Sequence, residues 1–318
     1  MHLNEKSEAV RNAMLCMARQ CWEQGLAAQA MLEIGDTDAL VHMAHDCVVR
    51  QNADGRLCDV EGTPALVDPA ICVEPVMEAA RIVDEPEWQA AAMRNVEYLL
   101  RDAPRSDTGA YYHLAGGSEV WADCLGMGPH VLVKYGHIDE GIALFKAVKA
   151  YLFDEASGLY HHKWDVTRGA FSRACFWAIG NGWAMLGLLR MYKHLIQLGD
   201  ARSQWAGREL VSLYSAVLPY QAQDGGFHDV LDDPNSFMET EFTEMFAYTV
   251  ANMVLLKLLP DTALSDAQRA GEYARSKVDR FGWVQGCAGS PTFEQPGVST
   301  EGQAHFLMME AALAGLEE

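Results

Sequence analysis

Carboxyl, imidazole and indole side chains recur at the starts of the helices that the sequence predicts, and this set suits the chemistry of sugars. A pyranose offers hydroxyl groups that carboxylates and histidines can hydrogen-bond, and a flatter C–H face on which an indole stacks. Cleaving a glycosidic bond also needs a proton donor, and a second carboxylate nearby raises the pKa of that donor because adjacent negative charges repel. Asp68 and Asp123 are the candidate catalytic pair. The candidate substrate contacts are Trp22, His113, His162, Trp164, Trp177 and Trp183.

Each of these side chains also has an ordinary structural interpretation. A carboxylate at the start of a helix accepts hydrogen bonds from free backbone N–H groups, so helix capping is the alternative role for Asp68 and Asp123. The helix dipole also lowers the pKa of an acid there, so a proton donor requires burial or a neighbouring charge to raise it again. Histidines and tryptophans also occur in protein interiors. The hypothesis of a sugar site therefore rests on the group of residues.

Twelve helices are predicted to position these residues. Stretches such as 8–22 and 87–102 carry apolar side chains at helical spacing, whereas the alternation typical of strands is almost absent. Six segments start with polar or aromatic residues and continue with small or apolar ones, near Trp22, Asp68, Trp121, Trp177, Glu239 and Thr300. Six evenly amphipathic segments alternate with them, at about 4–20, 38–51, 86–102, 138–154, 202–222 and 263–279.

This alternation predicts an all-α fold of the (α/α)6 barrel type. A helix that is apolar on nearly every side belongs inside, and one with a single apolar stripe covers it, so six pairs suggest a closed toroid. An open α-solenoid is the structural alternative. In the toroid the inner helices run roughly parallel, which brings their starts and the candidate residues to one mouth. We expect a single domain over 1–318, because the irregular stretches join helix pairs, near 52–67, 103–117, 155–175, 223–238 and 281–298.

The composition argues against several classes of partner. The chain has 24 basic and 44 acidic side chains, and its formal net charge of -20 repels nucleic acid and anionic membranes. No stretch approaches the roughly 18 consecutive apolar residues of a membrane span, and the N-terminus lacks an apolar signal segment. The eight cysteines show no paired spacing, so we interpret them as small buried apolar residues. We therefore expect a cytoplasmic protein with an oligosaccharide substrate.

No motif predicts a metal or an organic cofactor. The run of His228-Asp229 and Asp232-Asp233 lacks the spacing of a calcium-binding loop, and a turn before a helix explains the segment at 232–236. Gly180 and Gly182 follow no predicted strand and do not complete a nucleotide-binding fingerprint. Close packing of a loop against the barrel is the better interpretation of these glycines.

An ordered series of segments resembles the unsaturated rhamnogalacturonyl hydrolase family, which is related to the unsaturated glucuronyl hydrolases. The series begins near Trp22 and continues to the C-terminus, and it includes WADCLGMGPHVLVKYG, GLYHHKWD, FWAIGNGWAMLGLL, DGGFHDVLDDPNSFMETEFTEMFAY and STEGQAHFLM. The resemblance independently implies the (α/α)6 fold. It also implies removal of the 4,5-unsaturated uronic acid that polysaccharide lyases leave at the non-reducing end of oligosaccharides, without metal or cofactor.

The resemblance assigns roles to individual residues. Asp123, in W-A-D-C-L, corresponds to the general acid that protonates the vinyl ether at C4 and then serves as base for the water that adds at C5. Asp68 matches the second aspartate, whose implied role is tuning and substrate contact. His113 and His162 match histidines that contact the substrate, His113 with a one-residue gap in the alignment.

Two departures from the family pattern bear on the substrate. The family motif W-x-R-G-N-G-W has Ile179 in place of its arginine here, which removes a cation suited to an anionic sugar. The small, serine-containing segment of the family reads Glu241-Phe242-Thr243-Glu244 in this chain. The alternatives are therefore an epimerase that uses histidine as base, a glycosidase for a neutral sugar, or a noncatalytic carbohydrate-binding protein.

Overall fold

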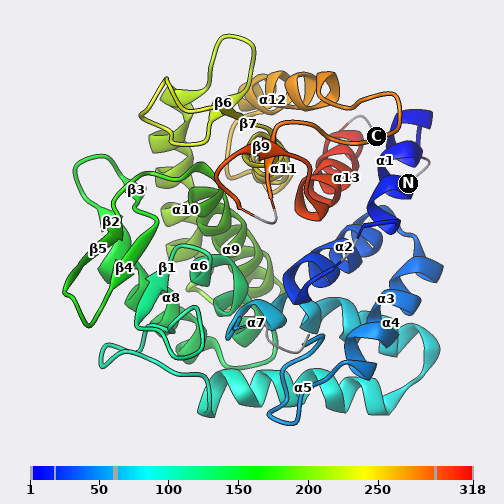
Figure 1. Ribbon diagram of the computed structural model, residues 1–318, viewed down its shortest axis with the longest axis vertical. Helices are drawn as coiled ribbons and strands as arrows, with labels where there is room; N and C mark the ends of the chain where they lie inside the picture. Colours follow the sequence, from blue (N-terminus) through cyan, green and yellow to red (C-terminus); the bar gives the residue numbers. More distant parts are fainter. Residues whose placement is uncertain (1–2, 18, 60–63, 290–291, 317–318) are drawn as a thin grey trace.

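The computed structural model describes residues 3–17, 19–59, 64–289 and 292–316, and its helices form an inner and an outer layer (Figure 1). The inner layer contains the six segments predicted for it. A short 3-10 helix begins the second segment, and the third is divided at Gly128. The inner elements are α2 (Cys21–Ile34), η1 (Asp68–Cys72) with α4 (Val73–Val83), α6 (Cys124–Met127) with α7 (Pro129–Lys134), α9 (Ala178–Gln197), α11 (Thr240–Leu255) and α13 (Thr300–Ala314).

The outer helices alternate with the inner ones along the chain, as predicted. Several end earlier than the sequence pattern suggests, and the 3-10 helices η2 (Leu218–Tyr220) and η3 (Asp261–Ala263) flank two of them. The outer elements are α1 (Glu5–Leu15), α3 (Thr37–Val49), α5 (Pro86–Arg101), α8 (Ile138–Leu152), α10 (Ser203–Val217) and α12 (Leu264–Ser276).

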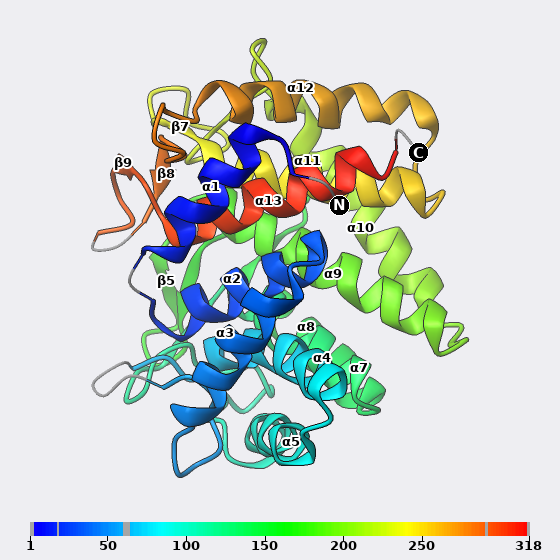
Figure 2. The ribbon, with the colours of Figure 1, turned by 90° about the vertical axis from the view of Figure 1, so that its right-hand side faces the viewer.

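Contacts between neighbouring inner helices close the ring. Helix α2 packs against α13 on one side and against η1 and α4 on the other, and η1 contacts α6. Helix α9 contacts α6, α7 and α11, and α11 contacts α13. The described ends of the chain therefore lie near one another, as Figure 1 and Figure 2 both show. The closed ring confirms the predicted (α/α)6 barrel and argues against the open solenoid.

Burial explains which helices lie inside. In α11, 14 of the 16 residues are buried, and in α13, 13 of 15. In the outer helix α12 only five of 13 residues are buried, and they form one stripe. An all-round apolar surface cannot be covered from one side, so the sequence pattern of α11 and α13 requires the interior. Buried glutamates are exceptions near the starts of these helices, and two of them, Glu241 and Glu301, line the cavity described below.

Short antiparallel strands occupy the segments that lead into the inner helices, and the sequence did not predict them. The largest sheet has the order β1-β4-β5, formed by β1 (Glu119–Trp121), β4 (Lys163–Asp165) and β5 (Ala170–Arg173). The other sheets are two-stranded: β2 (Phe153–Asp154) with β3 (Leu159–Tyr160), β6 (Phe227–His228) with β7 (Met238–Glu239), and β8 (Cys287–Ala288) with β9 (Pro296–Gly297).

The cysteines follow the predicted pattern with two exceptions. All eight are free thiols, and six of them are buried. Cys16 is exposed because α1 ends at Leu15, one residue earlier, and Cys175 is half-buried in the segment before α9. Along the described stretches of the chain, no helix combines the length and apolarity that crossing a membrane requires.

Candidate active site

A cavity of about 330 Å³ opens where the segments before the inner helices meet. Each of the six inner segments contributes residues at or near its start, and the sheet β1-β4-β5 contributes Trp121, Lys163 and Arg173. The connecting segments supply the rest of the wall, namely Pro64, Ala65, His113, Leu114, His162, Ala288, Thr292, Phe293 and Glu294. This volume lies in the range of small-ligand sites. Seven of the eight predicted site residues line the cavity, namely Trp22, Asp68, His113, Asp123, His162, Trp177 and Trp183.

Trp164 does not line the cavity. Its indole packs against Phe171, with ring centroids 4.8 Å apart, and against Tyr151, 6.2 Å away. The preceding residue, Lys163, lines the cavity instead, because successive side chains of a strand point to opposite faces. The placement of Trp164 gives no support to its predicted role as a substrate contact.

The two aspartates occupy equivalent positions before neighbouring inner helices. Asp68 is the first residue of η1 and is buried, and Asp123 directly precedes α6. Asp123 makes no capping hydrogen bond with its side chain. Within the described part of the chain, Asp68 Oδ1 and Asp123 Oδ2 are buried without a hydrogen-bond partner. Capping therefore does not explain the carboxylate of Asp123, and both groups have an oxygen available to a ligand.

Burial shifts both aspartates toward their protonated forms. Burial raises the pKa of Asp123 to about 6, against the opposing effects of its own backbone N–H and of Lys163. The pKa of Asp68 is raised well above its ordinary value by burial, then by the charges of Asp123 and Glu301. Because the charge of Asp123 acts on Asp68, the two carboxyls titrate as a coupled pair, and burial favours the protonated form of each.

Rings form a continuous series beside the aspartates. His113 Nδ1 lies 3.7 Å from Asp68 Oδ1, and its imidazole stacks on Trp121 with centroids 4.1 Å apart. His162 meets Trp121 edge-on at 5.8 Å and stacks on Trp177 at 4.1 Å. Burial lowers the pKa of His113 to about 3 and that of His162 well below its usual value. Both imidazoles are therefore neutral hydrogen-bonding groups at physiological pH.

A row of side chains across the sheet forms one wall. Trp121 pairs with Lys163 across β1 and β4, and Lys163 pairs with Arg173 across β4 and β5. The register between β4 and β5 shifts beside Lys163, and the exposed Ser172 is the extra residue. Lys163 Nζ lies 3.3 Å from the centroid of the Trp121 ring. β-Bulges commonly re-aim side chains next to functional sites, and this one places Arg173 rather than Ser172 opposite Lys163.

Arg173 and Asp229 hold the rings of His162 and Trp177 in place. Arg173 Nη1 lies 3.1 Å from His162 Nδ1, and Arg173 Nη2 lies 3.7 Å from Asp229 Oδ2. Trp177 donates its indole N–H to Asp229 Oδ1 at 3.0 Å. From the sequence, Asp229 is considered only as part of a metal site that the spacing argues against, whereas in the structure it holds two cavity residues in place.

Two glutamates complete the cavity from α11 and α13. Glu241 accepts a hydrogen bond from Ser299 Oγ at 3.2 Å, and His305 Nδ1 lies 3.3 Å from Glu241 Oε1. Glu301 accepts the indole N–H of Trp22 at 2.7 Å. Burial, followed by the charge of Asp123, raises the pKa of Glu241 to about 8. Burial and the charge of Glu241 raise that of Glu301 well above its usual range.

The sequence analysis missed Lys163, Arg173 and Glu301 as cavity residues. Glu301 had a usable signal, because it begins an inner segment as Asp68 and Asp123 do. Glu239 has a structural role, since its carboxylate caps α11 at the N–H of Phe242 and accepts the N–H of Ala288 at 2.9 Å.

Close packing at two glycines positions the segments that carry Asp68 and Asp123. A Cβ at Gly25 of α2 would lie 2.4 Å from Ile71 Cγ2, so only glycine lets η1 and its Asp68 approach this closely. A Cβ at Gly126 of α6 would lie 2.7 Å from Trp183 Cε3. Both contacts fix an aspartate segment against the next inner helix.

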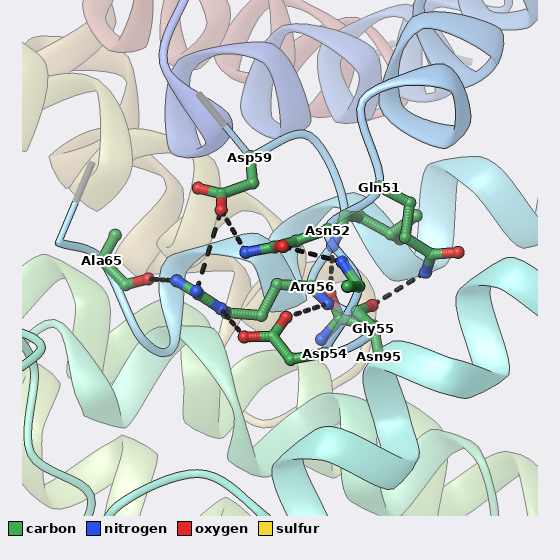
Figure 3. A network of polar contacts seen from close by, with 10 residues as sticks. Gln51, Asn52, Asp54, Gly55, Arg56, Asp59, Ala65 and Asn95 are labelled. Carbon is green, nitrogen blue, oxygen red and sulfur yellow. Dashed lines mark hydrogen bonds and ion pairs between the residues drawn. The ribbon is translucent and has the colours of Figure 1, made fainter. Parts of the chain in front are cut away.

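A polar network steadies the chain that leads into Asp68 (Figure 3). Arg56 donates from Nη1 to the carbonyl oxygen of Ala65 at 2.7 Å and from Nε to Asp54 Oδ2 at 2.9 Å. Asp59 lies 3.7 Å from Arg56 Nη2 and accepts a hydrogen bond from Asn52 Nδ2 at 2.6 Å. Ala65 lines the cavity, so this network links the α3–η1 connection to the cavity wall.

Two groups of potential metal ligands lie outside the cavity lining. One consists of three buried thiols, Cys47, Cys58 and Cys72. The other consists of Glu74, His130 and His194. Lys134 Nζ bonds to Glu74 at 2.6 Å, and the charges of Lys134 and Arg190 act on the same group, which opposes a further cation there.

Comparisons with known proteins agree with this fold. The profile described as Glycosyl Hydrolase Family 88 matches residues 2–312. Among curated proteins, the unsaturated rhamnogalacturonyl hydrolase YesR of Bacillus subtilis (strain 168) is 26% identical over 172 residues. That alignment covers 50% of this chain and 50% of YesR, so it spans half the length of that relative.

Solved structures show the same fold at low sequence identity. A possible member of the GH105 family from Salmonella enterica superposes with a TM-score of 0.86 at 17% identity, covering 98% of this chain and 93% of that one. The unsaturated glucuronyl hydrolase of Bacillus sp. GL1 gives a TM-score of 0.66 at 14% identity, covering 92% of this chain and 85% of that one.

Proposed function

The chain belongs to Glycosyl Hydrolase Family 88, and we propose that it releases a 4,5-unsaturated uronic acid from the non-reducing end of lyase-generated oligosaccharides. The observation that carries this proposal is the pair of buried carboxyls, Asp68 and Asp123, in one cavity lined by rings. Protonating a carbon–carbon double bond requires an acid that still holds its proton near neutral pH. Burial raises the pKa of both carboxyls, and the charge of Asp123 raises that of Asp68 further.

Asp123 acts as the general acid. It donates its proton to C4 of the C4=C5 vinyl ether, and positive charge develops at C5 and the ring oxygen. The Asp123 carboxylate then takes a proton from the water that adds at C5, which regenerates the acid. The resulting hemiketal opens and releases the remaining sugar chain, so the cycle consumes one water and no other reagent. Asp68 keeps the pKa of the pair raised and contacts the substrate.

The remaining cavity residues suit a pyranose. His113 and His162 are neutral and can accept or donate hydrogen bonds to hydroxyl groups. Trp22, Trp177 and Trp183 offer indole surface to the C–H face of the ring. The low pKa of both histidines makes them weak bases, which disfavours the alternative of a histidine-based epimerase.

The test is an ultraviolet assay against a panel of lyase-generated unsaturated disaccharides, because hydration removes the absorbance of the double bond. We expect turnover of at least one disaccharide by the wild type and loss of turnover in Asp123→Asn. Circular dichroism of the variant controls for folding. A wild type that turns over no disaccharide, or an Asp123→Asn enzyme of full activity, would contradict the proposal.

We also propose that the protein works in the cytoplasm on imported oligosaccharides. The support is its cysteine chemistry, since all eight thiols are free, as is usual in a reducing compartment. Fusing the chain to a fluorescent protein and imaging the cells tests this location.

A further inference from the structure

Lys163 is a cation in the cavity that forms no ion pair among the described residues, although the charges of Asp123, Glu119 and Glu294 act on it from further away. Its ammonium group lies over the Trp121 ring, and no carboxylate oxygen of the described residues comes within 4.0 Å of Nζ. Arg173, by contrast, already contacts Asp229 and His162. Burial lowers the pKa of Lys163, which is the expected effect of removing an ammonium group from water. A bound anion would offset that cost.

We propose that Lys163 binds the carboxylate of the terminal unsaturated uronic acid and thereby selects an anionic sugar. This inference rests on the proposed function. The carboxylate of such a sugar is attached to C5, next to the carbon that Asp123 protonates. Lys163 and Asp123 both line the cavity, and the charge of each acts on the other. A sugar that presents C4 to Asp123 therefore has its carboxylate beside the residue that carries the free cation.

This arrangement accounts for the departure at Ile179. Ile179 lines the cavity with an apolar side chain, where the resembling family has arginine. In this chain the positive charge comes from the sheet instead, from Lys163 on β4. The site of the cation has moved from an inner helix to a strand, while the cavity remains suited to an anion.

Burial reduces the opposition of the acidic cavity residues to a bound anion. It raises the pKa values of Asp68, Glu241 and Glu301, which favours the neutral carboxyl, whereas Glu294 also lines the cavity and its charge acts on Lys163. Arg173 acts as a positioning residue, because its guanidinium is engaged by Asp229 and orients His162. Lys163 is therefore the cation left for the substrate.

The test pairs two enzymes with two substrates. The substrates are one unsaturated disaccharide and the same disaccharide with its uronyl carboxylate converted to the primary amide. We expect the wild type to prefer the acid roughly 10- to 100-fold in kcat/KM, the range of a charged hydrogen bond. The Lys163→Met enzyme should lose this preference because its kcat/KM falls for the acid and stays the same for the amide. The Lys163→Arg enzyme should retain the preference. A Lys163→Met enzyme that still prefers the acid by the wild-type factor overturns the proposal.

Two further variants sharpen the result. Adding Ile179→Arg to Lys163→Met should restore part of the preference, by returning a cation to the cavity from the helix. The matched control is Lys146→Met, which removes an exposed lysine 5.1 Å from the Trp205 ring outside the cavity lining and should leave the preference unchanged.

Binding separates failure of this inference from failure of the proposed function. If the wild type cleaves neither disaccharide, the proposed function fails, and calorimetry with saturated galacturonate and its amide then tests Lys163 alone. Weaker galacturonate binding by Lys163→Met, with amide binding unchanged, supports the carboxylate site. Equal binding by both enzymes overturns it.

Discussion

The indole N–H of Trp177 donates to Asp229 Oδ1 at 3.0 Å, while the other oxygen of Asp229 lies 3.7 Å from Arg173. One carboxylate thus holds an aromatic ring and a cation that both touch His162.

Replacing Asp229 with alanine should impair substrate binding more than chemistry. Trp177 and Arg173 lose their shared partner, so the stacked His162 is no longer held in one orientation. We expect KM to rise roughly tenfold with a smaller change in kcat, measured with the preferred disaccharide. Asp232→Ala, a nearby exposed carboxylate, is the control and should behave as wild type. An unchanged KM in Asp229→Ala would show that Asp229 has no positioning role.

The pH dependence of kcat/KM should follow the protonated general acid. The pKa of Asp123 is raised to about 6, and a donor must be protonated, so activity should decline as pH rises above that value. The slope approaches about tenfold per pH unit if no other group intervenes. Initial rates across a range of buffers of equal ionic strength measure it. A profile that is flat from about pH 5 to pH 9 argues against Asp123 as the acid.

Glu241→Gln should make the protein more stable at alkaline pH. The pKa of Glu241 is raised to about 8 in the folded protein, from an ordinary value of 4.5. An acid whose pKa is higher in the folded protein than in the unfolded chain stabilises the fold fully below its unfolded pKa. This contribution to stability is lost as pH rises through the folded pKa. We expect the variant to gain up to a few kcal/mol at pH 9 and little at pH 4. Tm against pH measures this, with surface Glu87→Gln as control.

Arg56→Ala should loosen the connection that leads into Asp68. The variant loses the hydrogen bonds to Ala65 and Asp54, so we expect the free energy of unfolding to fall by about 1–3 kcal/mol. Urea denaturation measures this change. Arg81→Ala is the control, because the side chain of Arg81 is 72% exposed and its pair with Glu78 contributes little. Equal effects of the two substitutions would contradict a structural role for the network.

Gly126→Ala should disturb Trp183 and the segment of Asp123. The added Cβ would lie 2.7 Å from Trp183 Cε3, so the indole or α6 must shift. We expect a loss of about 1–3 kcal/mol in stability and reduced kcat, because Asp123 begins this helix. Gly315→Ala at the end of α13 meets no atom closer than 3.6 Å and should be neutral. Thermal unfolding compares the two.

The sequence predicts the helices well because most inner helices are buried on nearly all sides and the outer helices on one, although the inner helix α4 buries only five of its 11 residues. α11 and α12 illustrate the contrast, since burial covers almost all of the first and one stripe of the second. The periodicity of apolar residues along a helix can be recognised from local sequence alone, and it indicates how much of the helix a closed interior buries. The predicted helix ends are less accurate. The first outer helix was predicted over about 4–20, and α1 ends at Leu15.

The site was predicted only in part because its wall includes short strands. The sequence analysis treated 155–175 as irregular, so it could not use the alternation that points Lys163 and Trp164 to opposite faces. Arg173 reaches the cavity through a bulge, and a bulge leaves no periodic signal. Asp68 and Asp123 were accessible to sequence reasoning because they begin inner helices.

The extra residue in β5 has a consequence for how such enzymes diversify. Ser172 advances the strand by one position and brings a guanidinium opposite Lys163, without altering any inner helix. The bulge therefore sets which charged side chain lies opposite Lys163, while the inner helices and Asp123 lie outside this sheet. Changes in this sheet can therefore alter substrate preference with little effect on the folding of the helical barrel.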